Sequence, residues 1–150
     1  MAKEIERKFL VTDKSWRKRA GQGKSVRQAY LSRTETASIR VRIVDNAKAF
    51  LTIKSSQSGI SRSEFEYPIP VKDARALMKL RTGRVIEKRR HVVKAGKACF
   101  EVDVFEGDHS GLVIAEIELS GERAQFKRPA WLGKEVTDEK RYYNANLASA

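Results

Sequence analysis

Charged residues two positions apart recur along this chain, inside segments that alternate between apolar and polar residues. The first pair lies in residues 4–9, EIERKF, and a later one lies in residues 38–43, SIRVRI. Side chains two apart in a β-strand point to the same face of the sheet. Each charged pair therefore shares one face, and the apolar residues between share the other. The pattern predicts strands that each have one charged face and one apolar face.

The alternation predicts eight strands, at residues 3–12, 26–33, 38–43, 50–54, 62–67, 84–94, 98–105 and 112–119. Helical spacing or capping residues predict helices at 14–20, 71–80, 121–127 and 138–148, the last with Thr137 as its N-cap. Few helices separate the strands, so the sheet should be mainly antiparallel. At 150 residues the chain is expected to form one α+β domain, residues 1–150.

The charged face of this sheet would collect acids and bases in alternating pairs. Its expected members are Glu4, Glu6, Lys8, Arg40, Arg42, Lys54, Arg62, Glu64, Glu66, Lys88, Arg90, Glu101, Asp103, Glu116 and Glu118. Clustered carboxylates suit Mg²⁺ or Mn²⁺, whereas clustered Arg and Lys suit phosphate oxygens. A polyphosphate with a bound divalent cation fits both sets. If the sheet closes, an eight-stranded barrel has room for one small ligand.

Composition narrows the function classes. With 31 Lys and Arg against 19 Asp and Glu, the net charge of +12 indicates an anionic partner or substrate. Nucleic acid, an anionic membrane surface and a phosphorylated small molecule all remain open on charge alone. The single cysteine, Cys99, excludes an intrachain disulfide and a cysteine-rich metal site. The N-terminal residues lack the apolar core of a signal peptide, so we expect a cytoplasmic protein.

The ordered charge pairs resemble one known family. The segment 4–8, EIERK, is similar to the Glu-x-Glu-x-Lys motif of the CYTH superfamily, the triphosphate tunnel metalloenzymes. The later pairs follow that family's order at residues 40/42, 54, 64/66, 88/90, 101/103 and 116/118. This resemblance implies an eight-stranded antiparallel barrel with a charged interior and helices packed outside. Within the superfamily, the chain looks most like the short bacterial inorganic tripolyphosphatases.

The pairs and the resemblance together predict roles for individual residues. The expected metal ligands are Glu4, Glu6, Glu116 and Glu118, followed by Glu64 and Asp103. The expected phosphate-binding residues are Lys8, Arg40, Arg42, Lys54, Lys88 and Arg90. The expected catalytic group is Glu4, Glu6, Lys8 and Tyr30. For Tyr30, contact with substrate and simple packing are both open.

The predicted reaction is hydrolysis of a terminal phosphoanhydride of a triphosphate, most simply inorganic tripolyphosphate, with Mg²⁺ or Mn²⁺ as cofactor. An adenylyl cyclase using the same tunnel and a basic nucleic-acid-binding module are the alternatives. The absence of a known nucleic-acid-binding motif disfavours the module. We therefore expect a small-molecule triphosphate as partner, no stable nucleic acid partner and no membrane. The sequence leaves open whether the chain is a monomer or a homodimer.

Overall fold

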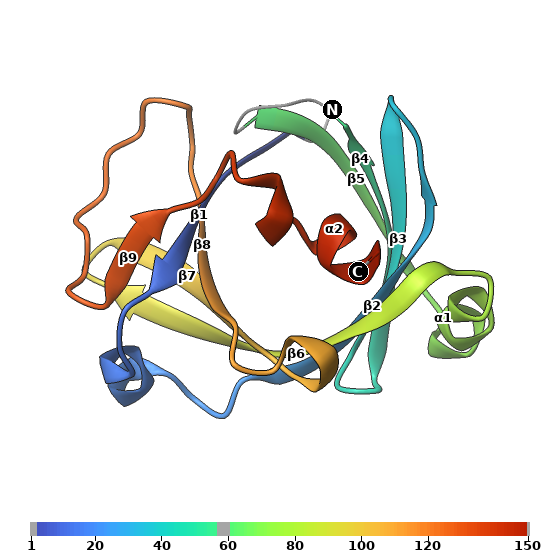
Figure 1. The fold of residues 1–150 in the computed structure, drawn as a ribbon, viewed down its shortest axis with the longest axis horizontal. Coiled ribbons are helices and arrows are strands. Elements are labelled where there is room, and N and C mark those ends of the chain that lie inside the picture. The colour runs from blue at the N-terminus through green and yellow to red at the C-terminus, as the bar shows by residue number, and fades with distance from the viewer. Residues whose placement is uncertain (1–2, 57–60, 150) are drawn as a thin grey trace.

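The computed structural model describes residues 3–56 and 61–149, and most of them form the wall of a β-barrel (Figure 1). The strands are β1 (Lys3–Val11), β2 (Lys24–Arg33), β3 (Ala37–Val44), β4 (Lys48–Ser55), β5 (Ser61–Ile69), β6 (Thr82–Ala95), β7 (Ala98–Phe105), β8 (Val113–Glu118) and β9 (Leu132–Glu135). The helices are α1 (Val71–Met78) and α2 (Asn144–Ser149), with 3₁₀ turns η1 (Ser15–Arg19), η2 (Gly107–His109) and η3 (Lys140–Tyr142).

Eight of these strands close on themselves. The hydrogen-bonded order is β5-β4-β3-β2-β6-β7-β8-β1, and β1 returns to β5 through Glu4, which lies opposite Arg62. Every pairing is antiparallel. The short ninth strand, β9, lies outside this ring and pairs with the last residues of β1. The predicted closed antiparallel barrel with helices packed on it is confirmed.

The apolar face of the sheet points outward and is covered on two sides. On one side Phe9 of β1, Phe100 of β7 and Ile117 of β8 pack against Trp16 of η1 and Trp131 beside β9. Burying apolar surface is the main favourable term in folding, at about 25 cal/mol per Å². The chain therefore places a hydrophobic core outside the barrel wall rather than within it.

Helix α1 covers the opposite side of the barrel. Val41 and Ile43 of β3 and Ala49 of β4 pack beneath Ala74 and Met78 of the helix. Pro70 precedes α1 in an extended conformation and Asp73 lies in its first turn, where a negative charge is favourable. The helix thus supplies the second outer layer, and the inward face of the barrel is left to charged side chains.

Helix α2 packs at one end of the barrel, against β6 and β2, and lies over the barrel opening in Figure 1. A third apolar cluster fills this end. It consists of Tyr30, Ile86, Phe105 and Ile114 from the barrel strands and Leu147 and Ala148 from α2. Because Ile86, Phe105 and Ile114 are each two residues from a charged interior residue, they belong to the inward face. The charged interior therefore ends on an apolar layer.

Three expectations about local structure are wrong. Residues 121–127 form turns and irregular chain, not a helix, and the helix expected at 138–148 is reduced to η3 and α2. Strand β9 was not predicted, because four residues with a glycine carry little periodic pattern. The predicted N-cap, Thr137, instead accepts a hydrogen bond from the backbone N–H of Lys8. Tertiary contact with β1 thus replaces the first turn of the expected helix.

Candidate active site

The interior of the barrel holds a cavity of about 260 Å³ whose lining is largely charged. Every strand of the closed ring contributes to its charged or polar surroundings, because inward-facing positions recur every second residue. The lining acids are Glu4, Glu6, Glu64, Glu66, Glu101, Glu116 and Glu118. The lining bases are Lys8, Arg40, Arg42, Lys54, Arg62 and Arg90. The prediction that these side chains face one another across a shared interior space agrees with this lining.

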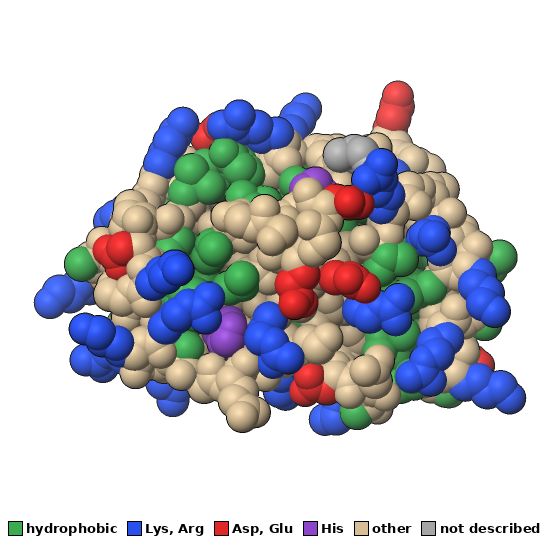
Figure 2. Space-filling model, turned by 60° about the horizontal axis from the view of Figure 1, so that its bottom comes forward, with side chains coloured by type: hydrophobic (Ala, Val, Ile, Leu, Met, Phe, Trp, Pro, Cys, Tyr) green, Lys and Arg blue, Asp and Glu red, His purple; other side chains and the backbone are tan. Residues whose placement is uncertain are grey.

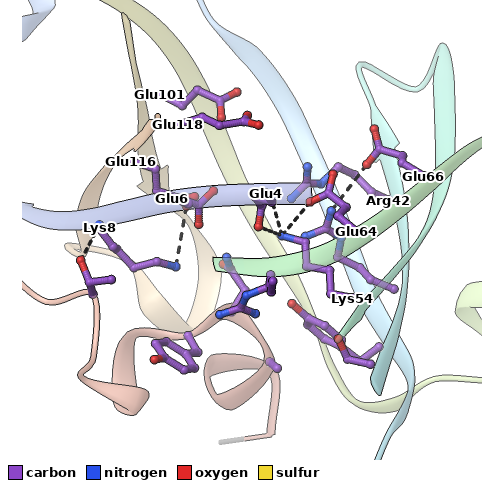
Figure 3. Close-up of a pocket in the computed structure, with 18 of the residues that line it drawn as sticks. Glu4, Glu6, Lys8, Arg42, Lys54, Glu64, Glu66, Glu101, Glu116 and Glu118 are labelled. Carbon is purple, nitrogen blue, oxygen red and sulfur yellow. Dashed lines mark hydrogen bonds and ion pairs between the residues drawn. The ribbon is translucent and has the colours of Figure 1, made fainter. Parts of the chain in front are cut away.

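The acids lie on two walls with β1 between them (Figure 3). Glu101, Glu116 and Glu118 lie together on the β7–β8 side, and Glu64 and Glu66 lie on the β5 side. Glu4 and Glu6 project from β1 into the space between the two groups. This arrangement follows from the register, which places Glu6 opposite Glu118 and Glu4 opposite Arg62.

Lys54 joins the two carboxylates at the β1–β5 seam. Its Nζ lies 3.0 Å from Glu4 Oε1 and 3.3 Å from Glu64 Oε2. On the other wall, Lys8 Nζ lies 3.8 Å from Glu116 Oε1. Burial lowers the pKa of Lys8, but the carboxylates of Glu116 and Glu6 outweigh it and raise the pKa above its usual value. Lys8 is therefore a stable cation in the tunnel.

Lys88, Asp103 and Arg90 form a buried ion cluster beneath the cavity. Lys88 and Asp103 are both fully buried, and Lys88 Nζ lies 2.7 Å from Asp103 Oδ2. Arg90 donates two hydrogen bonds to the same carboxylate, at 2.7 and 2.8 Å. Burial lowers the pKa of Lys88 to about 7, against the attraction of Asp103. Neither Lys88 nor Asp103 lines the cavity, so Asp103 could bind a cation only by releasing these partners.

Several cavity carboxylates carry unfavourable negative charge. The pKa of Glu6 lies well above its usual value because Glu6 is desolvated in the barrel and lies near Glu116 and Glu4. Burial and a hydrogen bond that protonated Glu4 donates to Glu64 also raise the pKa of Glu4. Burial and the charge of Glu4 raise the pKa of Glu118. Carboxylates in this condition favour a cation beside them.

The acids do not form a finished coordination shell. In the described ranges, no three His, Cys, Asp or Glu side chains are gathered closely enough to hold a metal ion as they stand. Mg²⁺ commonly binds one or two carboxylates and completes its octahedron with waters and substrate phosphates. Paired carboxylates beside an open cavity match that requirement, so the residues present fit a divalent cation bound together with a phosphorylated substrate.

The basic side chains of β3 retain unused hydrogen-bonding capacity. Arg42 Nε donates to Gln28 Oε1 at 2.8 Å, whereas the buried Nε of Arg40 has no hydrogen-bond acceptor among the described residues. Burial and the neighbouring charges of Arg40 and Arg90 lower the pKa of Arg42 to about 9. Cations held close together in this way favour an anion between them, and a phosphate offers several acceptor oxygens to Arg.

Most predicted site residues meet at the cavity, including Tyr30, which lies between the cavity and the apolar layer at the α2 end. Sequence reasoning missed four lining residues of the C-terminal segment, namely Thr137, Tyr143, Asn144 and Ala145. Tyr143 lies beneath Arg62, whose guanidinium carbon is 5.8 Å from the ring centroid. The run of polar residues before the apolar end of α2 is a weak signal for them, and by itself it predicts a helix start.

Known proteins with similar sequences cover almost the whole chain. The chain is 45% identical over 148 residues to the inorganic triphosphatase of Acetivibrio thermocellus, covering 98% of this chain and 94% of that protein. It is 40% identical over 148 residues to the inorganic triphosphatase of Nitrosomonas europaea, covering 97% of this chain and 96% of that protein.

Solved structures share the barrel. The inorganic triphosphatase NE1496 superimposes with a TM-score of 0.70 at 37% sequence identity, over 100% of this chain and 97% of that one. A structure described as the putative adenylyl cyclase HpAC1 from Hippeastrum has a TM-score of 0.59 at 16% identity, covering 79% and 80% of the two chains, and shows a common fold. The CYTH domain matches residues 2–148. The resemblance noted in the charge pairs is confirmed, and the chain belongs to the CYTH domain family.

Proposed function

We propose that this protein is a divalent-metal-dependent hydrolase of triphosphates, with inorganic tripolyphosphate as the preferred substrate. The observation that carries the proposal is the cavity itself, in which seven acids and six bases face one another across about 260 Å³. Bases alone would suit an anion, and acids alone would repel it. Their combination suits a polyphosphate that carries its own divalent cation. The names of the two bacterial relatives support the same activity.

Glu4, Glu6, Glu116 and Glu118 are the proposed metal ligands, with Glu64 beside them; Asp103 is a weaker candidate because of its ion pairs. When bound there, Mg²⁺ or Mn²⁺ supplies charge neutralisation on the phosphate oxygens and a bound water of lowered pKa. The raised pKa of Glu6 supports this assignment, since a cation relieves the repulsion among the carboxylates.

The basic residues bind and orient the phosphate chain. Arg40 and Arg42 on β3 can engage phosphate oxygens from one wall, and Lys8 from the other. Lys54 and Arg90 keep carboxylates in place while donating toward the cavity. Lys88 supports Arg90 and Asp103 from below. These fixed charges stabilise the negative charge of the transferring phosphoryl group and hold it in line for attack by water.

The location of the protein and its macromolecular partners are separate questions from the reaction. None of the helices in the described part of the chain is long and apolar enough to cross a bilayer. A cytoplasmic location and the absence of a stable nucleic acid partner stay predictions. The proposed partner is the small molecule tripolyphosphate.

The deciding experiment measures product release by the purified protein with tripolyphosphate, ATP or thiamine triphosphate, in Mg²⁺ or Mn²⁺ and in excess chelator. We expect orthophosphate from tripolyphosphate, and none with chelator. Glu116→Gln should lower kcat by at least about 100-fold, because it weakens binding of the cation that neutralises charge on the phosphate oxygens. Glu87→Gln is the matched control, because Glu87 pairs with Arg27 outside the tunnel. Cyclic AMP from ATP would favour a cyclase, and metal-independent turnover would contradict the metal assignment.

A further inference from the structure

The backbone of Lys8 is held by a segment that does not belong to the barrel. The edge of β1 that faces β5 pairs with it only over Lys3–Ile5, and from Phe9 onward the same strand pairs with β9. Lys8 lies between these two stretches. Its N–H donates to Thr137 Oγ1 at 3.1 Å, and its carbonyl accepts from the N–H of Val136 at 2.7 Å. The C-terminal segment thus supplies partners for the backbone of Lys8 where β5 does not.

The hydroxyl of Thr137 is fixed in direction by its two partners. A carboxylate only accepts and a backbone N–H only donates. The single hydroxyl hydrogen therefore goes to Glu135, and an oxygen lone pair accepts from Lys8. Glu135 is itself gripped by Arg7, which donates from Nε at 2.9 Å and from Nη2 at 2.6 Å. A bidentate pair of this kind is geometrically specific. In the chain of contacts Arg7–Glu135–Thr137–Lys8, the hydroxyl hydrogen of Thr137 and one lone pair of its oxygen are both engaged.

The side chain of Lys8 needs such a support. Four flexible methylene groups separate its backbone from Nζ, which lies 3.8 Å from Glu116 and 5.9 Å from the ring centroid of Tyr143. These contacts alone do not fix where the strand carries Lys8. The pairing of β1 with β8 holds one edge of the strand at Lys8, and Thr137 and Val136 hold the other edge. A misplacement of about 1 Å in an active site can reduce rate about 100-fold.

We propose that Thr137 is a positioning residue that, through Glu135 and Arg7, fixes the backbone of Lys8 so that its ammonium group faces the phosphate chain. This inference rests on the proposed function for the role of Lys8, but the contacts themselves do not. It assigns a purpose to a polar network along the edge of β1, between Arg7 and Thr137. It also explains why a threonine lines the cavity with its hydroxyl turned away from bulk water.

The test compares Thr137→Val, which keeps the shape of the side chain but removes the hydroxyl, with Thr137→Ser, which restores it. Thr12→Val is the matched control. Thr12 Oγ1 donates to the Trp131 carbonyl at 3.1 Å and joins the residue after β1 to the residue before β9, away from Lys8. We expect Thr137→Val to lower kcat/KM for tripolyphosphate about tenfold, mainly through kcat, since orientation is what is lost. Thr137→Ser and Thr12→Val should stay within about twofold of wild type.

Two further readouts separate positioning from a general structural role. In a Lys8→Ala background, Thr137→Val should cause no further loss of kcat/KM or of tripolyphosphate affinity, because its target side chain is gone. By NMR, amide hydrogen exchange at Lys8 should be at least about tenfold faster in Thr137→Val than in wild type, reflecting local opening. An equal loss in the Lys8→Ala background, or unchanged exchange at Lys8, would overturn the inference. Amide exchange can be measured without turnover. A wild-type protein inactive on tripolyphosphate would therefore contradict the proposed function, while the exchange rates would still show whether Thr137 holds the backbone of Lys8.

Discussion

Glu6 shows how a single side chain can serve a site at the expense of the fold. Its half-buried carboxylate is desolvated and lies near Glu116 and Glu4, and these causes raise its pKa. The folded state therefore keeps the Glu6 proton to a higher pH than the unfolded state does. Between the ordinary pKa of about 4.3 and the raised value, stability falls as pH rises, because the folded state binds more protons. Above its ordinary pKa, Glu6 therefore destabilises the empty protein.

Replacing this charge should stabilise the protein and remove its activity together. We expect Glu6→Gln to raise the thermal midpoint at pH 8 by at least about 2 °C, the equivalent of roughly 1 kcal/mol for a chain of this size. Turnover of tripolyphosphate should be nearly abolished. Calorimetry and a phosphate-release assay measure the two effects. Glu122→Gln, at an exposed position, is the control and should change neither. A lower midpoint for Glu6→Gln would contradict the electrostatic argument.

The same carboxylates should report metal binding without any reaction. Adding Mn²⁺ or Mg²⁺ to about 100 times its dissociation constant stabilises a protein by about 2.7 kcal/mol when only the folded state binds. We expect a matching rise in the thermal midpoint of wild type in the presence of a non-hydrolysed phosphate analogue. Glu6→Gln and Glu116→Gln should show a much smaller rise, whereas Glu87→Gln should behave as wild type. Equal shifts in all four proteins would place the metal outside the tunnel.

At the scale of elements, α2 depends on a glycine at the start of β6. Gly83 has φ +71°, and a Cβ there would lie 2.5 Å from the carbonyl oxygen of Ala148 in α2. Gly96, in the turn after the same strand, has φ +63° with no heavy atom within 4 Å of such a Cβ. The two glycines share the left-handed backbone conformation and differ in the contact with α2.

This pair allows the docking of α2 to be measured. Alanine at either position is expected to cost about 1 kcal/mol for the left-handed backbone. Gly83→Ala should cost distinctly more than Gly96→Ala and lower the thermal midpoint by about 2–4 °C for each further kcal/mol. Differential scanning calorimetry on both variants gives the difference. Equal midpoints would mean that α2 moves aside freely.

The barrel strands could be predicted from the sequence, whereas the C-terminal segment could not. The barrel strands were predictable because a charged pair such as Glu116 and Glu118 marks an inward face by local period alone. The C-terminal segment was not, because the role of Thr137 depends on a hydrogen bond with Lys8, 129 residues away. In the site, sequence parity placed Asp103 inside correctly. Only packing revealed that Lys88 and Arg90 occupy its oxygens.

For the whole molecule, the surplus positive charge lies outside the tunnel. Inside, eight acids oppose seven bases once Asp103 and Lys88 are added to the cavity lining. With a total of +12, the remainder of the chain carries +13. Figure 2 shows one exterior face, over which Lys and Arg side chains are widely spread. Such a field raises the local concentration of anions around the molecule and accelerates their arrival.

Electrostatic attraction of this kind should depend on salt. The screening length is about 10 Å at 0.1 M salt and about 3 Å at 1 M. We expect kcat/KM for tripolyphosphate to fall about tenfold between low and high NaCl, while kcat changes little. Steady-state kinetics at constant free metal concentration measure both constants. A kcat/KM that stays flat across the series would show that the exterior charge does not guide the substrate.

The apolar layer that Ile86, Phe105 and Ile114 form with Leu147 and Ala148 turns the tunnel into a blind passage. Product phosphate must then leave through the same open end by which substrate enters. Product and substrate compete for one opening, so accumulating product should inhibit the binding of substrate.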